Sequence, residues 1–217
     1  MIGYEGQGSL LQALKEKGWA ESLSAGPALS DRGATLFSID IGLTPEGYQH
    51  HEQVLVELFA WLRLIQQEGI ESWRQSELAV MSDMAFRYAE KISPADYVTK
   101  LASNMHKYSD NNLLRAPYQR GEFDKQLILG LMDQLSIEHM LLMVTAPEVD
   151  TTELSAFYQT PFSVKTMDKE AIEALKTTDS DFNLSLVGKN PYIPSNLDLI
   201  SEAKDQQPVL VTDTDGL

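Results

Sequence analysis

The sequence contains no cysteine, and only four of its 217 residues are histidine. A chain without cysteine forms no disulfide scaffold and offers no thiolate to a metal ion. Its longest apolar runs are far shorter than the roughly 20 residues of a membrane-spanning helix. Its first residues also lack the basic region and apolar core of a signal peptide. We therefore expect a soluble protein without a membrane partner, and both periplasm and cytoplasm stay open.

Positive charge is also scarce. Lysine and arginine number 17 against 32 aspartates and glutamates, so the net charge is -15. An acidic surface repels the phosphate backbone, which excludes nucleic acid as an expected partner. The hydrophobic content of 43% is ordinary for a globular protein, and 217 residues are enough to bury one sizeable core.

Two short stretches look like parts of zinc motifs. The sequence HHEQVL begins like H-E-x-x-H, and LSIEH ends like the inverted form H-x-x-E-H. Either motif needs two histidines four residues apart, so that both reach one metal from the same helical face. Leu55 and Leu135 occupy the positions where the missing histidines would stand. We therefore predict no catalytic residue and no metal site, and we rank a non-catalytic site at His50 and His51 last, because adjacent helical side chains diverge.

Periodicity and capping signals predict the order of secondary structure. Residues 34–43 alternate polar and apolar side chains, as a half-buried strand does. Thr44, Pro45 and Glu46 form a helix start with an N-cap, a proline in the first turn and an acidic residue near the dipole. In chain order the patterns first predict a helix at 9–18 and an antiparallel strand pair that is joined through the turn-forming SDRG at 30–33 and reaches 43. They then predict helices at 44–69, 71–91, 93–108 and 123–135, a buried strand at 138–147, a short helix at 168–175, an extended connector at 190–199 and a strand at 208–217.

This order predicts an α+β fold, in which helices pack on one face of an antiparallel sheet. Trp19, Trp61 and Trp73 are expected to anchor the core or the contacts between helices. His51 falls on the apolar stripe of the helix at 44–69, so we interpret it as a packed or half-buried histidine.

Several stretches together resemble one enzyme family. Residues 3–19, GYEGQGSLLQALKEKGW, resemble the family pattern G-H-E-G-x-G-S-L-L-x-x-L-K-x-K-G-W, and residues 43–54, LTPEGYQHHEQV, resemble L-T-x-x-G-x-x-H-x-x-x-V. The likeness continues through EGIESW, FRYAEK and NPYIPSN in the same order. The chain thus resembles the pitrilysin/insulin-degrading-enzyme group of the M16 zinc metallopeptidases over nearly its whole length.

The resemblance implies a place within a larger enzyme. Enzymes of this group have four homologous α+β domains that enclose a chamber, and the zinc motif H-x-x-E-H lies in the first of them. The chain resembles most of the second domain, truncated at its N-terminal strands. The implied division is residues 1–150 for this domain, 151–207 for its remainder and the inter-domain connector, and 208–217 for the first strand of the following domain.

The resemblance also implies a substrate exosite. In this family an edge strand of the second domain accepts the N-terminal part of the substrate peptide by strand addition. The matching backbone positions here are Ser22, Leu23, Ser24, Ala25 and Gly26, and a nearby glycine-rich loop contributes Gly3, Tyr4 and Glu5, where Tyr4-Glu5 matches the family's His-Glu. An edge strand with small side chains allows another backbone to come close. The alternative is that these small residues mark a crowded packing position.

Two functions therefore stay open. The first is a non-catalytic segment of a pitrilysin-type zinc endopeptidase, which walls the chamber and holds peptide substrate; its partners would be the peptide and the remaining domains or catalytic subunit. The chain itself needs no cofactor, whereas zinc belongs to the intact parent enzyme. The second is a free-standing peptide- or protein-interaction module, such as the non-catalytic subunit of a split peptidase.

Overall fold

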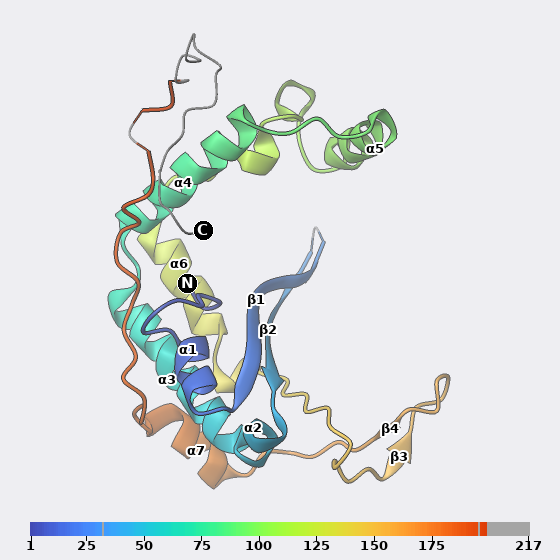
Figure 1. Ribbon diagram of the computed structural model, residues 1–217. Helices are drawn as coiled ribbons and strands as arrows, with labels where there is room; N and C mark the ends of the chain where they lie inside the picture. Colours follow the sequence, from blue (N-terminus) through green and yellow to red (C-terminus); the bar gives the residue numbers. More distant parts are fainter. Residues whose placement is uncertain (32, 195, 199–217) are drawn as a thin grey trace, which may run out of the picture.

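The computed structural model describes residues 1–31, 33–194 and 196–198 (Figure 1). Its longer elements are α1 (Leu10–Glu16), β1 (Ala20–Ser30), β2 (Thr35–Leu43), α2 (Pro45–Gln49), α3 (His51–Glu68), α4 (Ser72–Arg87), α5 (Pro94–Met105), α6 (Lys125–Gln134) and α7 (Lys169–Thr177). Figure 1 shows α1, α3 and α6 on the same side of the β1–β2 hairpin. This arrangement confirms the predicted α+β fold with helices over one face of an antiparallel sheet. The strand expected at 208–217 lies outside the described residues.

The β1–β2 hairpin has the predicted antiparallel pairing. Its register runs from Ala20 opposite Leu43 to Ser30 opposite Thr35. The turn is closed by the Asp31 carboxylate, which accepts hydrogen bonds at 2.7 Å from the backbone N–H groups of Gly33 and Ala34. Aspartate stabilises turns in this way because its short side chain reaches the backbone two residues further on. The turn signal in the sequence was therefore correct.

The helix predicted at 44–69 is divided into two. Thr44 caps α2 as expected, since its hydroxyl accepts a hydrogen bond of 2.9 Å from the Gly47 N–H. The helix then breaks at His50, whose φ of -111° and ψ of 18° are not helical. The Trp19 side chain stacks on the His50 ring with centroids 4.4 Å apart, and Gly47 lies so close to the Trp19 carbonyl that no Cβ would fit. Tertiary contact with Trp19 thus accompanies the break.

The core lies where α1, β1 and α3 meet. The N-cap of α1 is Ser9, whose hydroxyl accepts a hydrogen bond of 3.1 Å from the Gln12 N–H. Trp61 is almost fully buried, and its indole N–H donates to the Ile2 carbonyl at 3.2 Å, which ties the N-terminal loop to α3. The other buried apolar side chains of this cluster are Leu10, Leu11, Leu14, Ala20, Leu23, Val54, Leu58, Phe59, Leu62, Ile65 and Leu175.

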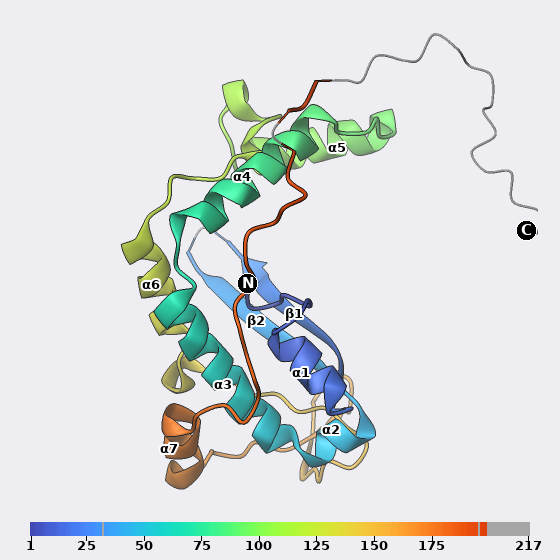
Figure 2. The same ribbon diagram turned by 60° about the vertical axis from the view of Figure 1, so that its left-hand side comes forward.

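Helices α4 and α5 form an arm that extends away from this core (Figures 1 and 2). The predicted helices at 71–91, 93–108 and 123–135 are confirmed as α4, α5 and α6, each with shorter ends. α5 has no buried residue, and α4 has only Ser82. No described helix is long and apolar enough to cross a membrane.

The strand predicted at 138–147 is wrong. Residues Ile137–His139 form a single 3-10 turn, and the residues that follow pair with no strand in the described part of the chain. Leu141 and Met143 are 87% and 79% exposed. The apolar sequence has the composition of a buried strand, but a strand needs a hydrogen-bonded neighbour, and none lies beside it here. An apolar cavity of about 540 Å³ instead separates this segment from β2.

Residues 148–177 contain one element that the sequence patterns missed. Glu153–Leu154 (β3) and Pro161–Phe162 (β4) pair as a short antiparallel hairpin, whose turn includes Gln159 at a φ of 53°. The predicted helix at 168–175 is confirmed as α7, which is capped by the Asp168 carboxylate on the Ala171 N–H at 2.7 Å. Strands β3 and β4 were missed because each has only two residues, too few to show an alternating pattern in the sequence.

After α7 the chain returns along α3 and α4 (Figures 1 and 2). We call residues 178–190 the return segment. Glu57 of α3 is fully buried, and its carboxylate accepts hydrogen bonds from the Ser180 hydroxyl, from the Asp181 N–H at 3.1 Å and from the Gln53 side chain at 3.1 Å. Arg63 donates to the carbonyls of Leu175 and Thr178. Two charged side chains of α3 thus hold the start of the return segment and the end of α7 in place.

The Glu57 contact predicts a large effect of substitution. Glu57→Ala removes the acceptor of three part-buried hydrogen bonds, from the Ser180 hydroxyl, the Asp181 N–H and the Gln53 side chain, which we expect to lower the free energy of unfolding by about 1–3 kcal/mol. Glu57→Gln keeps one acceptor oxygen, so its free energy of unfolding should fall by less. Urea unfolding of the 217-residue chain measures both, with the exposed Glu68→Ala of the same helix as the control. Equal stability of Glu57→Ala and Glu68→Ala would contradict this account.

A second contact predicts a dependence on pH. Lys176 of α7 lies 2.7 Å from the Glu138 carboxylate, and this hydrogen bond is the main cause that lowers the pKa of Glu138 from 4.5 to about 2. Because the unfolded chain binds this proton more readily, the stabilisation is complete above about pH 4.5 and is lost as the pH falls toward 2. We expect Lys176→Met to raise the Glu138 pKa measured by NMR, while Lys169→Met leaves it near 2. An unchanged Glu138 pKa in Lys176→Met would refute the assignment.

Candidate functional site

The predicted exosite positions of β1 all take part in the hairpin. Ser22, Leu23, Ser24, Ala25 and Gly26 pair in order with Gly42, Ile41, Asp40, Ile39 and Ser38 of β2. These pairs occupy one edge of β1. No third strand pairs with β1 in the described residues, so its outer edge is not part of a ladder.

The side chains along this stretch alternate between core and surface. Leu23 is only 4% exposed and packs in the core, whereas Ser22 and Ser24 are exposed. Ala25 and Gly26 are half-buried. The Leu23 side chain therefore anchors the strand in the core. Only the Leu23 backbone can contact a bound peptide. Small polar side chains on the other face present no bulk that would keep a second backbone away.

The glycine-rich loop reaches the same strand. Gly3 lies against Ala25, because a Cβ built on Gly3 would stand 3.4 Å from the Ala25 backbone nitrogen. Tyr4 is half-buried, its N–H donates to the Met1 carbonyl at 3.0 Å, and Glu5 is exposed. The structure thus brings Gly3 to the Ala25 part of β1.

Glycine at position 8 has a backbone explanation. Its φ is +79°, a conformation that glycine adopts without the steric cost of a side chain. Its carbonyl accepts a hydrogen bond of 2.9 Å from the Ser185 N–H of the return segment, and a Cβ at this position would overlap the Ser185 side chain. Turn geometry ahead of α1 therefore accounts for Gly8, and a phosphate-binding loop is not needed.

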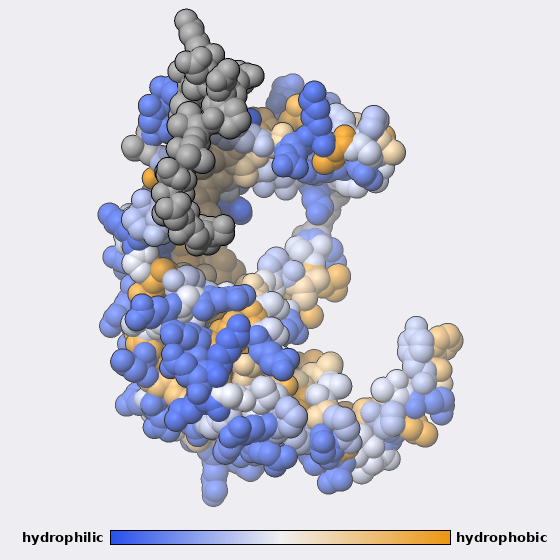
Figure 3. Space-filling view, viewed as in Figure 1, coloured by the Kyte–Doolittle hydropathy of each residue, from blue (hydrophilic) through white to orange (hydrophobic). Residues whose placement is uncertain are grey.

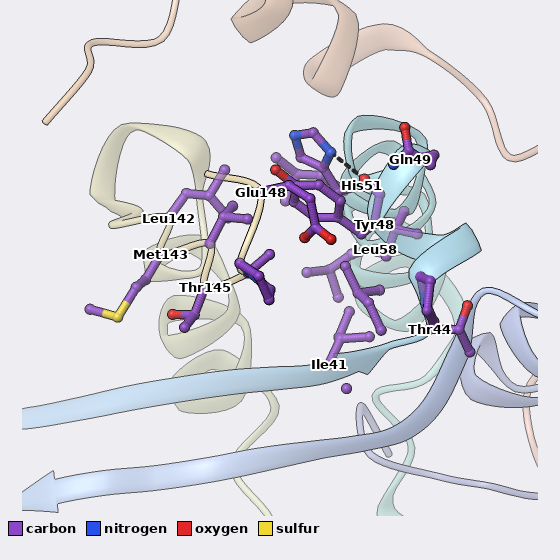
Figure 4. Close-up of a pocket in the computed structure, with 18 of the residues that line it drawn as sticks. Ile41, Thr44, Tyr48, Gln49, His51, Leu58, Leu142, Met143, Thr145 and Glu148 are labelled. Atoms are coloured by element: carbon purple, nitrogen blue, oxygen red, sulfur yellow. Dashed lines mark hydrogen bonds between the residues drawn. The ribbon is translucent and has the colours of Figure 1, made fainter. Parts of the chain in front are cut away.

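A cavity between β2, α2, α3 and residues 142–148 was not foreseen (Figure 4). Ile41, Val54, Leu55 and Leu58 make it largely apolar, and Figure 4 shows His51 among the side chains that line it. The His51 Nδ1 lies 2.7 Å from the Tyr48 carbonyl, which indicates a proton on that nitrogen. The half-buried state expected for His51 is confirmed. The apolar stripe of the helix predicted at 44–69 indicated one wall of this cavity. The opposite wall comes from residues 142–148, which are nearly 90 residues further along the chain.

The histidines do not assemble a zinc site. His50 stacks on Trp19, His51 is held by the Tyr48 carbonyl, and His139 lies in the 3-10 turn with its Nδ1 3.4 Å from the Ser136 hydroxyl. Over the described ranges, no group of three or more histidine, aspartate or glutamate side chains is placed to hold a metal ion. The donors among the described residues do not suit a zinc that needs three protein ligands, so we derive no zinc chemistry from them.

The described residues thus form an antiparallel hairpin covered by helices, and no third strand pairs with β1 among them. Residues 1–78 match the family profile described as "Peptidase M16 inactive domain", and residues 86–217 match "Middle or third domain of peptidase_M16". The chain belongs to the M16 peptidase family.

Known proteins are similar to this chain along nearly its whole length. Insulin-degrading enzyme of Mus musculus is 32% identical over 218 residues, which cover 99% of this chain and 21% of that protein. A peroxisomal insulin-degrading enzyme-like protein of Arabidopsis thaliana is 31% identical, with 99% and 22% covered. The crystal structure of pitrilysin superimposes with a TM-score of 0.87 at 26% identity, over 99% of this chain and 23% of that one. The resemblance seen in the sequence is confirmed, and the chain spans about a fifth of the length of these relatives.

An added methyl group is expected to have different effects at Gly8 and at Gly26. We expect Gly8→Ala to destabilise the chain by about 1–2 kcal/mol, because it forces a side chain into the left-handed region and against Ser185. Gly26→Ala should not destabilise it, since a Cβ there meets nothing within 4 Å. Urea unfolding compares the two variants. A loss in Gly26→Ala as large as in Gly8→Ala would favour the crowded-packing explanation of the small residues in β1.

Proposed function

We propose that this chain walls the chamber of a pitrilysin-type zinc metalloendopeptidase and holds the N-terminal part of its peptide substrate. Residues 1–150 form the second domain in this proposal, and residues 151–207 complete it and connect it to the next. The zinc and the motif that binds it belong to another domain of the parent enzyme. Family membership supports the enzyme class, and the free edge of β1 is the observation that carries the binding role.

The exosite works by strand addition. An extended peptide pairs with the outer edge of β1 at Ser22–Gly26, and main-chain hydrogen bonds supply affinity with little dependence on sequence. Burial of Leu23 fixes which face of the strand is inward, and Gly3 of the loop lies against Ala25 of the same strand. Gly26 has open space where a side chain would be, so packing within the chain does not require glycine there. The open space favours a role of Gly26 in allowing the backbone of a bound peptide to come close to β1.

The proposed partners are the remaining domains or the catalytic subunit of the peptidase. Exposed apolar side chains on α4 and α6 support this part of the proposal: Leu78 and Met81 on α4, and Leu127 and Leu131 on α6. Exposed apolar area of this kind marks surfaces that other protein covers. The same surface also suits the non-catalytic subunit of a split peptidase, which differs only in whether the catalytic domain is on a separate chain.

Hydrogen exchange of the chain with a synthetic unstructured decapeptide tests the exosite. With a free amino terminus, this probe should protect backbone amides within Ser22–Gly26. Ala25→Pro removes an N–H on that strand and should abolish the protection, whereas Ala25→Ser keeps the N–H and should preserve it. Added zinc should produce no hydrolysis of the decapeptide. Protection elsewhere but not on β1 would overturn the exosite, and cleavage with zinc would overturn the non-catalytic assignment.

A further inference from the structure

Charge is distributed very unevenly between the arm and the rest of the chain. Residues 86–120, which we call the basic arm, contain six lysines and arginines against three carboxylates, a net charge of +3. The remaining residues carry eleven against 29, a net charge of -18. The basic arm comprises the end of α4, the whole of α5 and the two 3-10 turns before α6. A positive projection on an acidic protein is a local feature that the overall composition conceals.

The basic arm encloses an apolar groove of about 640 Å³. Its floor and walls include Phe86, Ile92, Tyr97, Leu101, Leu114 and Tyr118. Ile92 and Leu114 are 48% and 52% exposed, so the groove is open, and Figure 3 shows hydrophobic colour interspersed with hydrophilic colour on this part of the surface. The groove is large enough for one or two bulky side chains of a ligand.

Two lysines stand at the groove. Lys91 and Lys100 both line it, and the Lys100 ammonium lies 5.7 Å from the centre of the Tyr118 ring. No carboxylate pairs with either lysine among the ion pairs of the described residues. Arg115, in contrast, is occupied by Asp83 at 2.9 Å. Glu90 is the single acidic residue of the lining, so the groove combines apolar walls with a net excess of available positive charge.

We propose that this groove binds an acidic segment of the substrate peptide, with an aliphatic or aromatic side chain in the groove and carboxylates at Lys91 and Lys100. The inference rests on the proposed function, because it adds a second contact for the peptide held at β1. Charge complementarity is the argument for this occupant. The overall charge of -15 favours cationic peptides instead. At physiological ionic strength, however, the electrostatic field of a charge decays over about 8 Å. The charges nearest the groove therefore determine which peptide binds there.

Two acetylated hexapeptides provide a direct test, Ac-EELFEE-NH₂ and Ac-KKLFKK-NH₂. NMR titration of the isotope-labelled chain should show the acidic peptide shifting amides around Ile92 and Leu101, with affinity that falls as salt is added. The double variant Lys91→Glu/Lys100→Glu should weaken this binding by about tenfold or more, since it places like charges opposite the peptide. Lys15→Glu/Lys17→Glu at the C-terminal end of α1 changes the net charge equally and should leave the binding unchanged.

The outcomes separate this inference from the exosite. Equal or tighter binding of the cationic peptide at the groove, or equal loss in the two double variants, would overturn the acidic segment as occupant. Shifts at the basic arm without protection of β1 by the decapeptide would support the groove and contradict the exosite. Protection of β1 without shifts at the arm would leave the proposed function standing and refute the groove.

Discussion

Burial of one face of α3 is the constraint on which the other parts depend. Trp61 and Ile65 pack in the core with α1 and β1, and the Trp61 indole holds the N-terminal loop through the Ile2 carbonyl. On the same helix, Glu57 and Arg63 direct their charged groups to the return segment and the end of α7. Buried charges are stable only when they are hydrogen-bonded, so these contacts fix where the later chain runs. A single helix thus positions the N-terminal loop and the start of the return segment.

The candidate exosite depends on this core through Leu23. Its burial fixes the inward face of β1, and strand alternation then places Ser22 and Ser24 outward. The opposite edge of the hairpin faces the apolar cavity beside residues 142–148. The two edges therefore differ: the one on β1 is lined by small residues, while the one on β2 adjoins apolar side chains. Binding of an extended peptide is the function that we propose for the first edge.

Local signals in the sequence predicted what local interactions determine. The cap at Thr44, the turn at Asp31 and the alternation of β2 are formed by neighbouring residues, and all were predicted correctly. Three features depend on distant residues and were missed. The break at His50 involves Trp19, and the segment at 138–147 lacks a partner strand in the described residues. The cavity at His51 has walls far apart in the sequence. The exosite positions came from the family resemblance, and the structure adds the contact of Gly3 with Ala25.

The central claim is that these 217 residues act within a larger peptidase. The most direct measurement is the mass of the native protein in an extract of the source cell, detected with an antibody raised against this chain. The account predicts a band several times larger than 24.3 kDa, because the chain spans about a fifth of its relatives. A band at 24.3 kDa, with no larger protein associated with it in a native gel, would contradict that claim.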